Sequence, residues 1–127
     1  MRILIVSNGP DLLADFLATL MEADDVRLGF APTAVAALEG VKTNPPTVCV
    51  VDGNLPDVGE TGAFGLVARL MQVNALVSTA VLSDLSQEDF HEAGEGLGIL
   101  CQLPAHPDGT SAKALLAALA KIFTPAQ

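Results

Sequence analysis

The sequence predicts an α/β fold in which a single domain carries five parallel strands, with helices on both faces of the sheet. The clearest sign is the unbroken apolar run of residues 48–51, which ends at Asp52 and a Gly-Asn turn. Such a run is typical of a strand buried on both faces. Four further short apolar segments alternate with helix-like segments along the chain. The length, 127 residues, suits one domain with its own core.

The first strand–helix unit is marked by turn residues. Residues 2–6 predict the first strand. Pro10 suits the first turn of the helix that follows, because its missing N–H would be unpaired there in any case. Asn8 or Gly9 is the expected cap of this helix, whose apolar face comprises Leu12, Leu13, Phe16, Leu17 and Leu20.

The second and third units follow the same alternation. Residues 25–30 predict a short strand, and Thr33 is expected to cap a helix that runs to about residue 41. The Asn-Pro-Pro sequence of residues 44–46 closes that helix. After the strand that ends at Asp52, a long turn leads to a helix predicted at residues 63–72.

The last two strand–helix units complete the alternation. Residues 75–82 and 99–103 predict the fourth and fifth strands. Ser86 is expected to cap a short acidic helix between them. Thr110 or Ser111 is expected to open a last helix that continues to residue 123.

Chain connections limit how these elements can be arranged. Right-handed crossovers leave few topologies, among them the flavodoxin-like, doubly wound (βα)5 sheet with strand order 2-1-3-4-5. We expect residues 1–123 to form this domain and residues 124–127 to form a tail. The first and third strands are then neighbours, which places Ser7 and Asn8 beside Asp52 at the edge where such sheets bind ligands.

Composition narrows the classes of function. Fifteen acidic residues against six basic ones give a net charge of −9, which argues against direct binding to nucleic acid. No window approaches 18 continuous apolar residues and the N-terminus has no signal-peptide pattern, so we expect a cytoplasmic protein that does not enter a membrane. Cys49 and Cys101 fall in predicted buried strands, where they are expected to be core residues.

No pattern indicates an enzyme. The glycine-rich segment 94–98 precedes a strand, which is the wrong order for a dinucleotide-binding loop. His91 and His106 are expected to be solvated surface residues. No Ser/His/Asp arrangement or metal-ligand spacing stands out.

Six short phrases occur in a fixed order along the chain. They are Ile3-Leu4-Ile5-Val6, Asn44-Pro45-Pro46, Val51-Asp52-Gly53-Asn54-Leu55-Pro56-Asp57 with Gly62, Ala80-Val81-Leu82-Ser83, Gly96 and Leu103-Pro104. Together they resemble the receiver domain of bacterial response regulators, which act in two-component signalling and phosphorelays. The resemblance covers essentially the whole chain. It implies that Asp52 matches the phospho-accepting aspartate and that Ser83 matches the switch threonine.

The chain departs from the receiver pattern at residues that such domains use for phosphoryl transfer. Ser7 and Asn8 stand where receivers have the two acids that hold Mg²⁺. Leu103 replaces a lysine and cannot neutralise a phosphoryl oxygen. Asp84 replaces the small residue after the switch position, and Leu100 replaces an aromatic residue of the fifth strand.

The predicted edge is also acidic, whether or not the resemblance is considered. None of the six basic residues falls in the strand ends or the loops after them, which instead hold Asp11, Asp52, Asp57, Glu60, Asp84 and Asp108. An edge of like charge repels phosphate. We therefore expect no metal site there; if a divalent ion binds at all, its ligands should be Asp52, Asn8 and Asn54.

The sequence thus predicts a pseudo-receiver, a receiver-like regulatory module that acts through protein–protein contacts and is not an enzyme. Phosphorylation at Asp52 is expected to be lost or impaired. The alternative is an atypical but functional receiver, in which Asp84 and Asn8 replace the missing acids around Mg²⁺. No cofactor is expected unless this alternative holds.

The last helix predicts where a partner binds. Residues 112–123 are apolar nearly all round, whereas a helix on the edge of a sheet needs one apolar stripe. With the strand at residues 99–103 they form a surface that receivers commonly use for contacts. The expected partner is another protein, a fused effector domain, or a second copy in a two-fold dimer. Alternatively, the alanines of this helix only tolerate exposure and favour helix formation.

Overall fold

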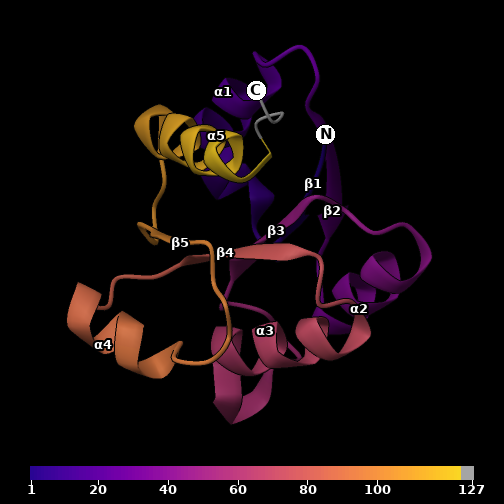
Figure 1. Ribbon diagram of the computed structural model, residues 1–127, viewed down its shortest axis with the longest axis vertical. Coiled ribbons are helices and arrows are strands. Elements are labelled where there is room, and N and C mark those ends of the chain that lie inside the picture. The colour runs from indigo at the N-terminus through magenta and orange to yellow at the C-terminus, as the bar shows by residue number, and fades with distance from the viewer. Residues whose placement is uncertain (124–127) are drawn as a thin grey trace.

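Five parallel strands form one sheet through the middle of the computed structural model, which describes residues 1–123 (Figure 1). The strands are β1 (Arg2–Val6), β2 (Arg27–Ala31), β3 (Val48–Asp52), β4 (Ser78–Leu82) and β5 (Cys101–Leu103). Their order is β2-β1-β3-β4-β5, with every pair parallel. The predicted flavodoxin-like fold class is therefore confirmed. The predicted tail, residues 124–127, lies outside the described residues.

Helices cover both faces of this sheet (Figure 1). One face carries α1 (Ala14–Met21), which follows a 3₁₀ turn at Pro10–Leu13, and α5 (Gly109–Phe123). The other face carries α2 (Ala34–Thr43), α3 (Gly62–Val73) and α4 (Gln87–Ala93). None of these helices is long and apolar enough to cross a membrane.

The central strands supply side chains to two separate cores. On β1, Ile3 and Ile5 pack with α1 and α5, whereas Leu4 and Val6 pack with α2 and α3. This alternation follows from the period of two in a strand. It explains why β1 and β3 are apolar at consecutive positions, since both of their faces are covered.

Helix α5 rests on α1 as well as on the sheet, and this contact accounts for part of its apolar excess. Leu115 and Leu119 are buried and Leu116 is half-buried. Ile122 is the large apolar residue of the helix that is exposed among positions 109–122, with 52 % of its surface accessible. The apolar surface left for a partner is therefore smaller than the sequence suggested.

Three strands begin later than predicted. The strand predicted at residues 25–30 begins at Arg27, because Val26 N–H bonds to the Ala23 carbonyl in a turn. The strand predicted at residues 75–82 begins at Ser78, since Asn74 accepts hydrogen bonds from the N–H groups of the next turn. The strand predicted at residues 99–103 covers only Cys101–Leu103, after the left-handed turn at Gly98 (φ 62°).

Two of the predicted helix caps are confirmed. The Thr33 hydroxyl accepts from Ala36 N–H at 3.0 Å, and the Ser86 hydroxyl accepts from Asp89 N–H at 3.1 Å. Gly9 precedes the first helical turn without a side-chain cap. The last helix begins at Gly109, earlier than predicted, because Asp108 accepts from Ser111 N–H at 3.0 Å and caps it.

We predict that Gly62→Ala destabilises the fold whereas Gly40→Ala does not. Gly62 opens α3 with φ 59° and ψ −148°, a conformation nearly restricted to glycine, so an alanine there should cost about 1–2 kcal/mol. Gly40 lies inside α2, and a Cβ there would only touch the Leu4 side chain at 3.7 Å. Alanine at that position should add up to about 1 kcal/mol of stability. Urea unfolding of both variants measures the difference; equal effects would contradict the strain at Gly62.

Candidate functional site

The candidate site lies at the carboxyl edge of the sheet. Because the strands are parallel and each helix runs back across them, all strand ends and all helix N-termini meet at this edge. Ser7 follows β1, Asp52 is the last residue of β3, and Ser83 follows β4. The neighbouring positions of β1 and β3 bring Ser7 and Asp52 together, as the topology predicted.

Asp52 is half-buried and both of its carboxylate oxygens accept hydrogen bonds. The Ser7 hydroxyl donates to Oδ2 at 3.1 Å, and Asn54 N–H donates to Oδ1 at 3.1 Å. Ser7 is itself held, being 4 % exposed and accepting from Gly9 N–H at 3.1 Å. Ser7 therefore fixes the orientation of the carboxylate, where a receiver would have an acid that binds a metal.

Three other predicted site residues make no hydrogen bond with Asp52. Asn8 is exposed, and its side chain makes no hydrogen bond within residues 1–123. Leu103, at the position of the missing lysine, is 3 % exposed and belongs to the core beneath α1 and α5. Leu100, at the position of the missing aromatic residue, packs half-buried against the same core.

The loop between β4 and α4 is held by a set of hydrogen bonds. Ser83 N–H bonds to the Leu103 carbonyl at 2.9 Å, and the Ser83 hydroxyl accepts from Leu85 N–H at 3.1 Å. The Gln102 side chain donates to the carbonyls of Ser83 and Leu85 at 3.2 and 2.8 Å. Asp84 accepts from Ala105 N–H at 3.3 Å. Asp84 thus bridges to the loop after β5.

Asp57 caps a helix from a distance. Its two carboxylate oxygens accept from Ala34 N–H at 2.7 Å and Val35 N–H at 3.1 Å, at the first turn of α2. The hydrogen bond from Ala34 is the main cause that lowers the pKa of Asp57, followed by that from Val35, with a smaller attraction from Arg69. This carboxylate is exposed and is stabilised by the helix terminus.

The N-terminus of α5 binds two carboxylates. Asp108 accepts from the N–H and hydroxyl groups of Ser111, and these bonds lower its pKa. Asp15, from α1, accepts from Gly109 N–H at 2.8 Å. Helix N-termini carry partial positive charge, so much of the acidity at this edge has a favourable partner. The sequence interpretation counted only Lys and Arg as counter-charges and missed these N–H groups.

Three carboxylates near this edge accept hydrogen bonds from within the fold. Here the carboxylate of Asp52 is bonded to Ser7 and Asn54, and Asp84 and Asp57 are engaged elsewhere. Within residues 1–123, no three His, Cys, Asp or Glu side chains are arranged to hold a metal ion.

The two cysteines lie away from this edge. Cys49 is buried inside β3, where desolvation raises the pKa of its thiol to about 12. Cys101 is half-buried in β5, and burial also raises its pKa. Both thiols are unpaired, and a raised pKa keeps them in the unreactive protonated form.

We predict that Asp57→Asn lowers the melting temperature at pH 7 by roughly 2–6 °C. The folded pKa of Asp57 lies below its usual value of 3.8, so the ionised carboxylate stabilises the fold above about pH 4. That contribution is lost as the pH falls through the lowered pKa. The two proteins should therefore converge in melting temperature towards pH 2.5, measured by circular dichroism.

Glu60→Gln is the matched control for this experiment. Glu60 is an exposed acid of the same loop, and its side chain makes no hydrogen bond in the described part of the chain. Its replacement removes the same charge without removing a hydrogen bond to a helix terminus. An equal loss of stability in the control would show that net charge, and not the cap on α2, is responsible.

Comparisons with known proteins find similar solved structures, but no similar family model or curated protein. No protein-family model matches the chain, and no curated protein matches it. Solved structures do match. The response regulator domain of Thermotoga maritima CheB has a TM-score of 0.78 at 16 % identity, with 100 % of this chain and 98 % of that chain covered.

Two structures of RcsB give similar values. The isolated REC domain from Salmonella enterica serovar Typhimurium, with the phosphomimetic BeF₃⁻, has a TM-score of 0.80 at 20 % identity, over 95 % of this chain and 88 % of that chain. The RcsB response regulator from Salmonella typhimurium has a TM-score of 0.81 at 21 % identity, over 98 % of this chain but 63 % of that longer chain. At these identities the likeness shows that the chain has the receiver fold.

Proposed function

We propose that this chain is a cytoplasmic, receiver-like signalling module that acts by binding another protein or a fused effector domain. In this proposal it is not an enzyme, and phosphoryl transfer to Asp52 is lost or severely impaired. The receiver fold supports the signalling role. The match to the longer RcsB chain supports the idea that such a fold works together with further domains.

The hydrogen bond from Ser7 to Asp52 is the observation that carries this proposal. A carboxylate that attacks a phosphoryl group needs an available oxygen and nearby positive charge to stabilise the transferred oxygens. At Asp52 one oxygen accepts from a hydroxyl and the other from a backbone N–H, and Leu103 offers no charge. Ser7 stands in place of an acid, so the chain has exchanged a metal ligand for a hydrogen-bond donor.

The loop between β4 and α4 is held by several hydrogen bonds, and this also supports a module with one conformation. A phosphorylation switch needs a loop that can take two arrangements of similar energy. Here Gln102, Asp84 and the backbone of Ser83 hold the loop without any ligand. The alternative of a working receiver would require Asp84 to leave Ala105 and turn towards Mg²⁺.

We predict that acetyl phosphate with Mg²⁺ leaves the protein unmodified, as judged by intact-mass measurement. The reason is that the edge has neither an available acid pair nor a basic side chain near Asp52 to stabilise the transferred group. A stoichiometric gain of one phosphoryl group that disappears in Asp52→Asn would establish a functional receiver.

A second variant tests the cause of the inactivity. Ser7→Asp together with Asn8→Asp restores two acids beside Asp52 and removes the hydroxyl that bonds to it. Titration calorimetry should show Mg²⁺ binding that the unmodified chain lacks, because carboxylates are the preferred ligands of this ion. Equal Mg²⁺ binding by both proteins would show that Ser7 and Asn8 are not what limits the site.

We also propose a two-fold dimer through β5 and α5, for which Ile122 is the exposed apolar residue. A stable interface would bury on the order of 800 Å² per subunit. Light scattering at high micromolar concentration should show a dimer, and Ile122→Glu should make it monomeric. Val35→Glu, at an apolar position of α2 that is more exposed than Ile122, should leave the dimer unchanged. A monomeric unmodified protein would rule out this dimer.

A further inference from the structure

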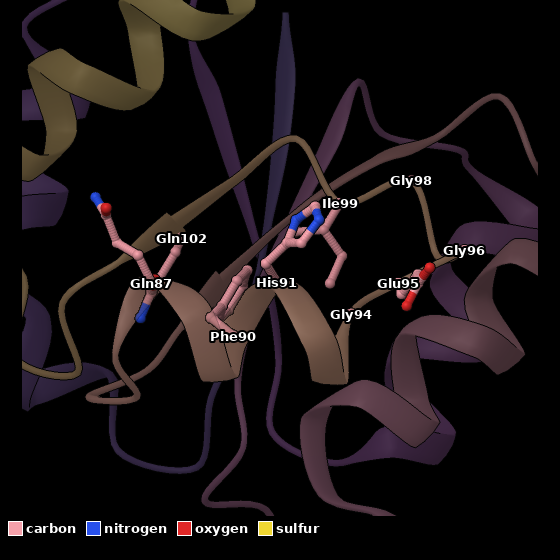
Figure 2. Close-up of a pocket in the computed structure, with 9 residues that line it drawn as sticks. All are labelled: Gln87, Phe90, His91, Gly94, Glu95, Gly96, Gly98, Ile99 and Gln102. Carbon is pink, nitrogen blue, oxygen red and sulfur yellow. The ribbon is translucent and has the colours of Figure 1, made fainter.

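A groove separates α4 from the start of β5, on the face of the sheet that α2, α3 and α4 cover. Its volume is about 390 Å³, within the size range of small ligand pockets. Figure 2 shows the residues that line it: Gln87 and Gln102 lie at one end, Glu95 lies at the other, and Phe90, His91 and Ile99 lie between them.

The floor of the groove is apolar and fixed. Phe90 is 9 % exposed and meets Phe64 of α3 edge to face, with ring centroids 5.3 Å apart. Ile99 is half-buried against the same core. At Gly94 a Cβ would lie 2.9 Å from Ile99 Cδ1 and 3.3 Å from the Phe90 carbonyl oxygen, so a side chain there would displace Ile99. The groove is therefore built by close packing and does not depend on a loose loop.

The segment of the chain that carries the groove is strongly acidic, and one of its acids, Glu95, lines the groove. Between residues 70 and 112 the chain has no Lys or Arg, and it has six acids: Asp84, Glu88, Asp89, Glu92, Glu95 and Asp108. Four of these, at positions 88, 89, 92 and 95, lie on or directly after α4 and are exposed. The nearest basic residues along the chain are Arg69 in α3 and Lys113 in α5.

These four acids differ from the acids at the carboxyl edge. Asp52, Asp57 and Asp108 each accept hydrogen bonds from the fold, whereas no side chain among the four does so within residues 1–123. Glu92 and Glu95 also stand at the C-terminal end of α4, where the helix dipole disfavours negative charge. Glu88 and Glu92 are four residues apart, a spacing at which like charges repel. Glu88 and Asp89 lie in the first turn of α4, where the helix dipole favours them, but Glu92 and Glu95 gain nothing from the fold, and a cationic partner would stabilise them.

We propose that this groove docks a short basic segment of a partner protein. One apolar side chain of the segment enters the groove against Phe90 and Ile99. Its Lys or Arg side chains face Glu95, which lines the groove, and Glu88 and Glu92, which are exposed on α4 beside it. Charge complementarity selects this class of partner, since an acidic peptide would be repelled. The inference rests on the proposed function, because it names the partner of the interaction module.

One residue, Gln102, connects this groove with the loop between β4 and α4. Gln102 lines the groove and its side chain also donates to the carbonyls of Ser83 and Leu85. A bound segment that contacts Gln102 therefore touches the group that holds the loop between β4 and α4. No phosphoryl group at Asp52 is needed for this contact.

The probe for this proposal is a peptide of about fourteen residues that carries Leu and Lys at helical spacing, titrated into ¹⁵N-labelled protein. Chemical-shift changes should concentrate at residues 87–102. A peptide with Ser in place of Leu should not bind, because it lacks the apolar anchor. Changes spread evenly over the acidic surface, or binding by the Ser peptide, would overturn the proposal and indicate attraction by net charge alone.

Two matched sets of substitutions locate the charges. The triple variant E88K, E92K, E95K should weaken binding by about tenfold or more, and raised salt should weaken the unmodified complex, since exposed charges are screened. The control E22K, D24K, E39K changes the net charge equally at exposed positions elsewhere and should weaken binding less than about twofold. Equal losses in the two sets would overturn the proposal.

A neutral triple variant controls for misfolding of the lysine variant. E88Q, E92Q, E95Q keeps the side-chain size, relieves the repulsion along α4 and should still lose most of the binding. Binding that survives in this folded variant would also overturn the proposal. Peptide binding at the groove and phosphorylation of Asp52 are measured independently. A chain that gains a phosphoryl group at Asp52 can still be tested for peptide binding, and a chain that does not bind the peptide can still be tested for phosphorylation.

Discussion

The parallel sheet imposes one constraint on which the rest of the structure depends: every strand ends, and every helix begins, at the same edge. Carboxylates that follow the strands therefore meet backbone N–H groups that no helix can satisfy internally. Asp57 serves α2 and Asp108 serves α5 in this way. Two of the acids that look like repelling charges in the sequence, Asp57 and Asp108, therefore cap helix ends.

This constraint also sorts the acids of the chain into two kinds. At the edge, Asp52, Asp57, Asp84 and Asp108 accept hydrogen bonds within the fold, and Asp52 is oriented by Ser7. Along α4 the acids are exposed and their side chains make no hydrogen bond within residues 1–123. In our proposal the first kind no longer serves phosphoryl transfer, and the second kind serves the recognition of a partner. The same fold can support different functions through different surface residues.

Much of the fold follows from local patterns in the sequence. Thr33 and Ser86 could be predicted as helix caps because a cap bonds to a residue only three positions away. The pairing of Ser7 with Asp52 follows from the strand order. The distant bonds could not be found this way. Asp57 lies 23 residues from Ala34, and Asp15 lies 94 residues from Gly109, so no short pattern links them. Gln102 was overlooked for the same reason, since its partners belong to another loop.

The bond from Gly109 to Asp15 joins the last helix to the first, and this has a consequence for synthesis on the ribosome. Residues 109–123 emerge after the rest of the sheet and its other helices, yet α5 covers the core formed by Ile3, Ile5, Phe16 and Leu20. Until then, the apolar face of the sheet that α1 and α5 share is only partly covered. Such partly folded chains are prone to aggregate, so the domain is protected from aggregation only after α5 has packed on the sheet.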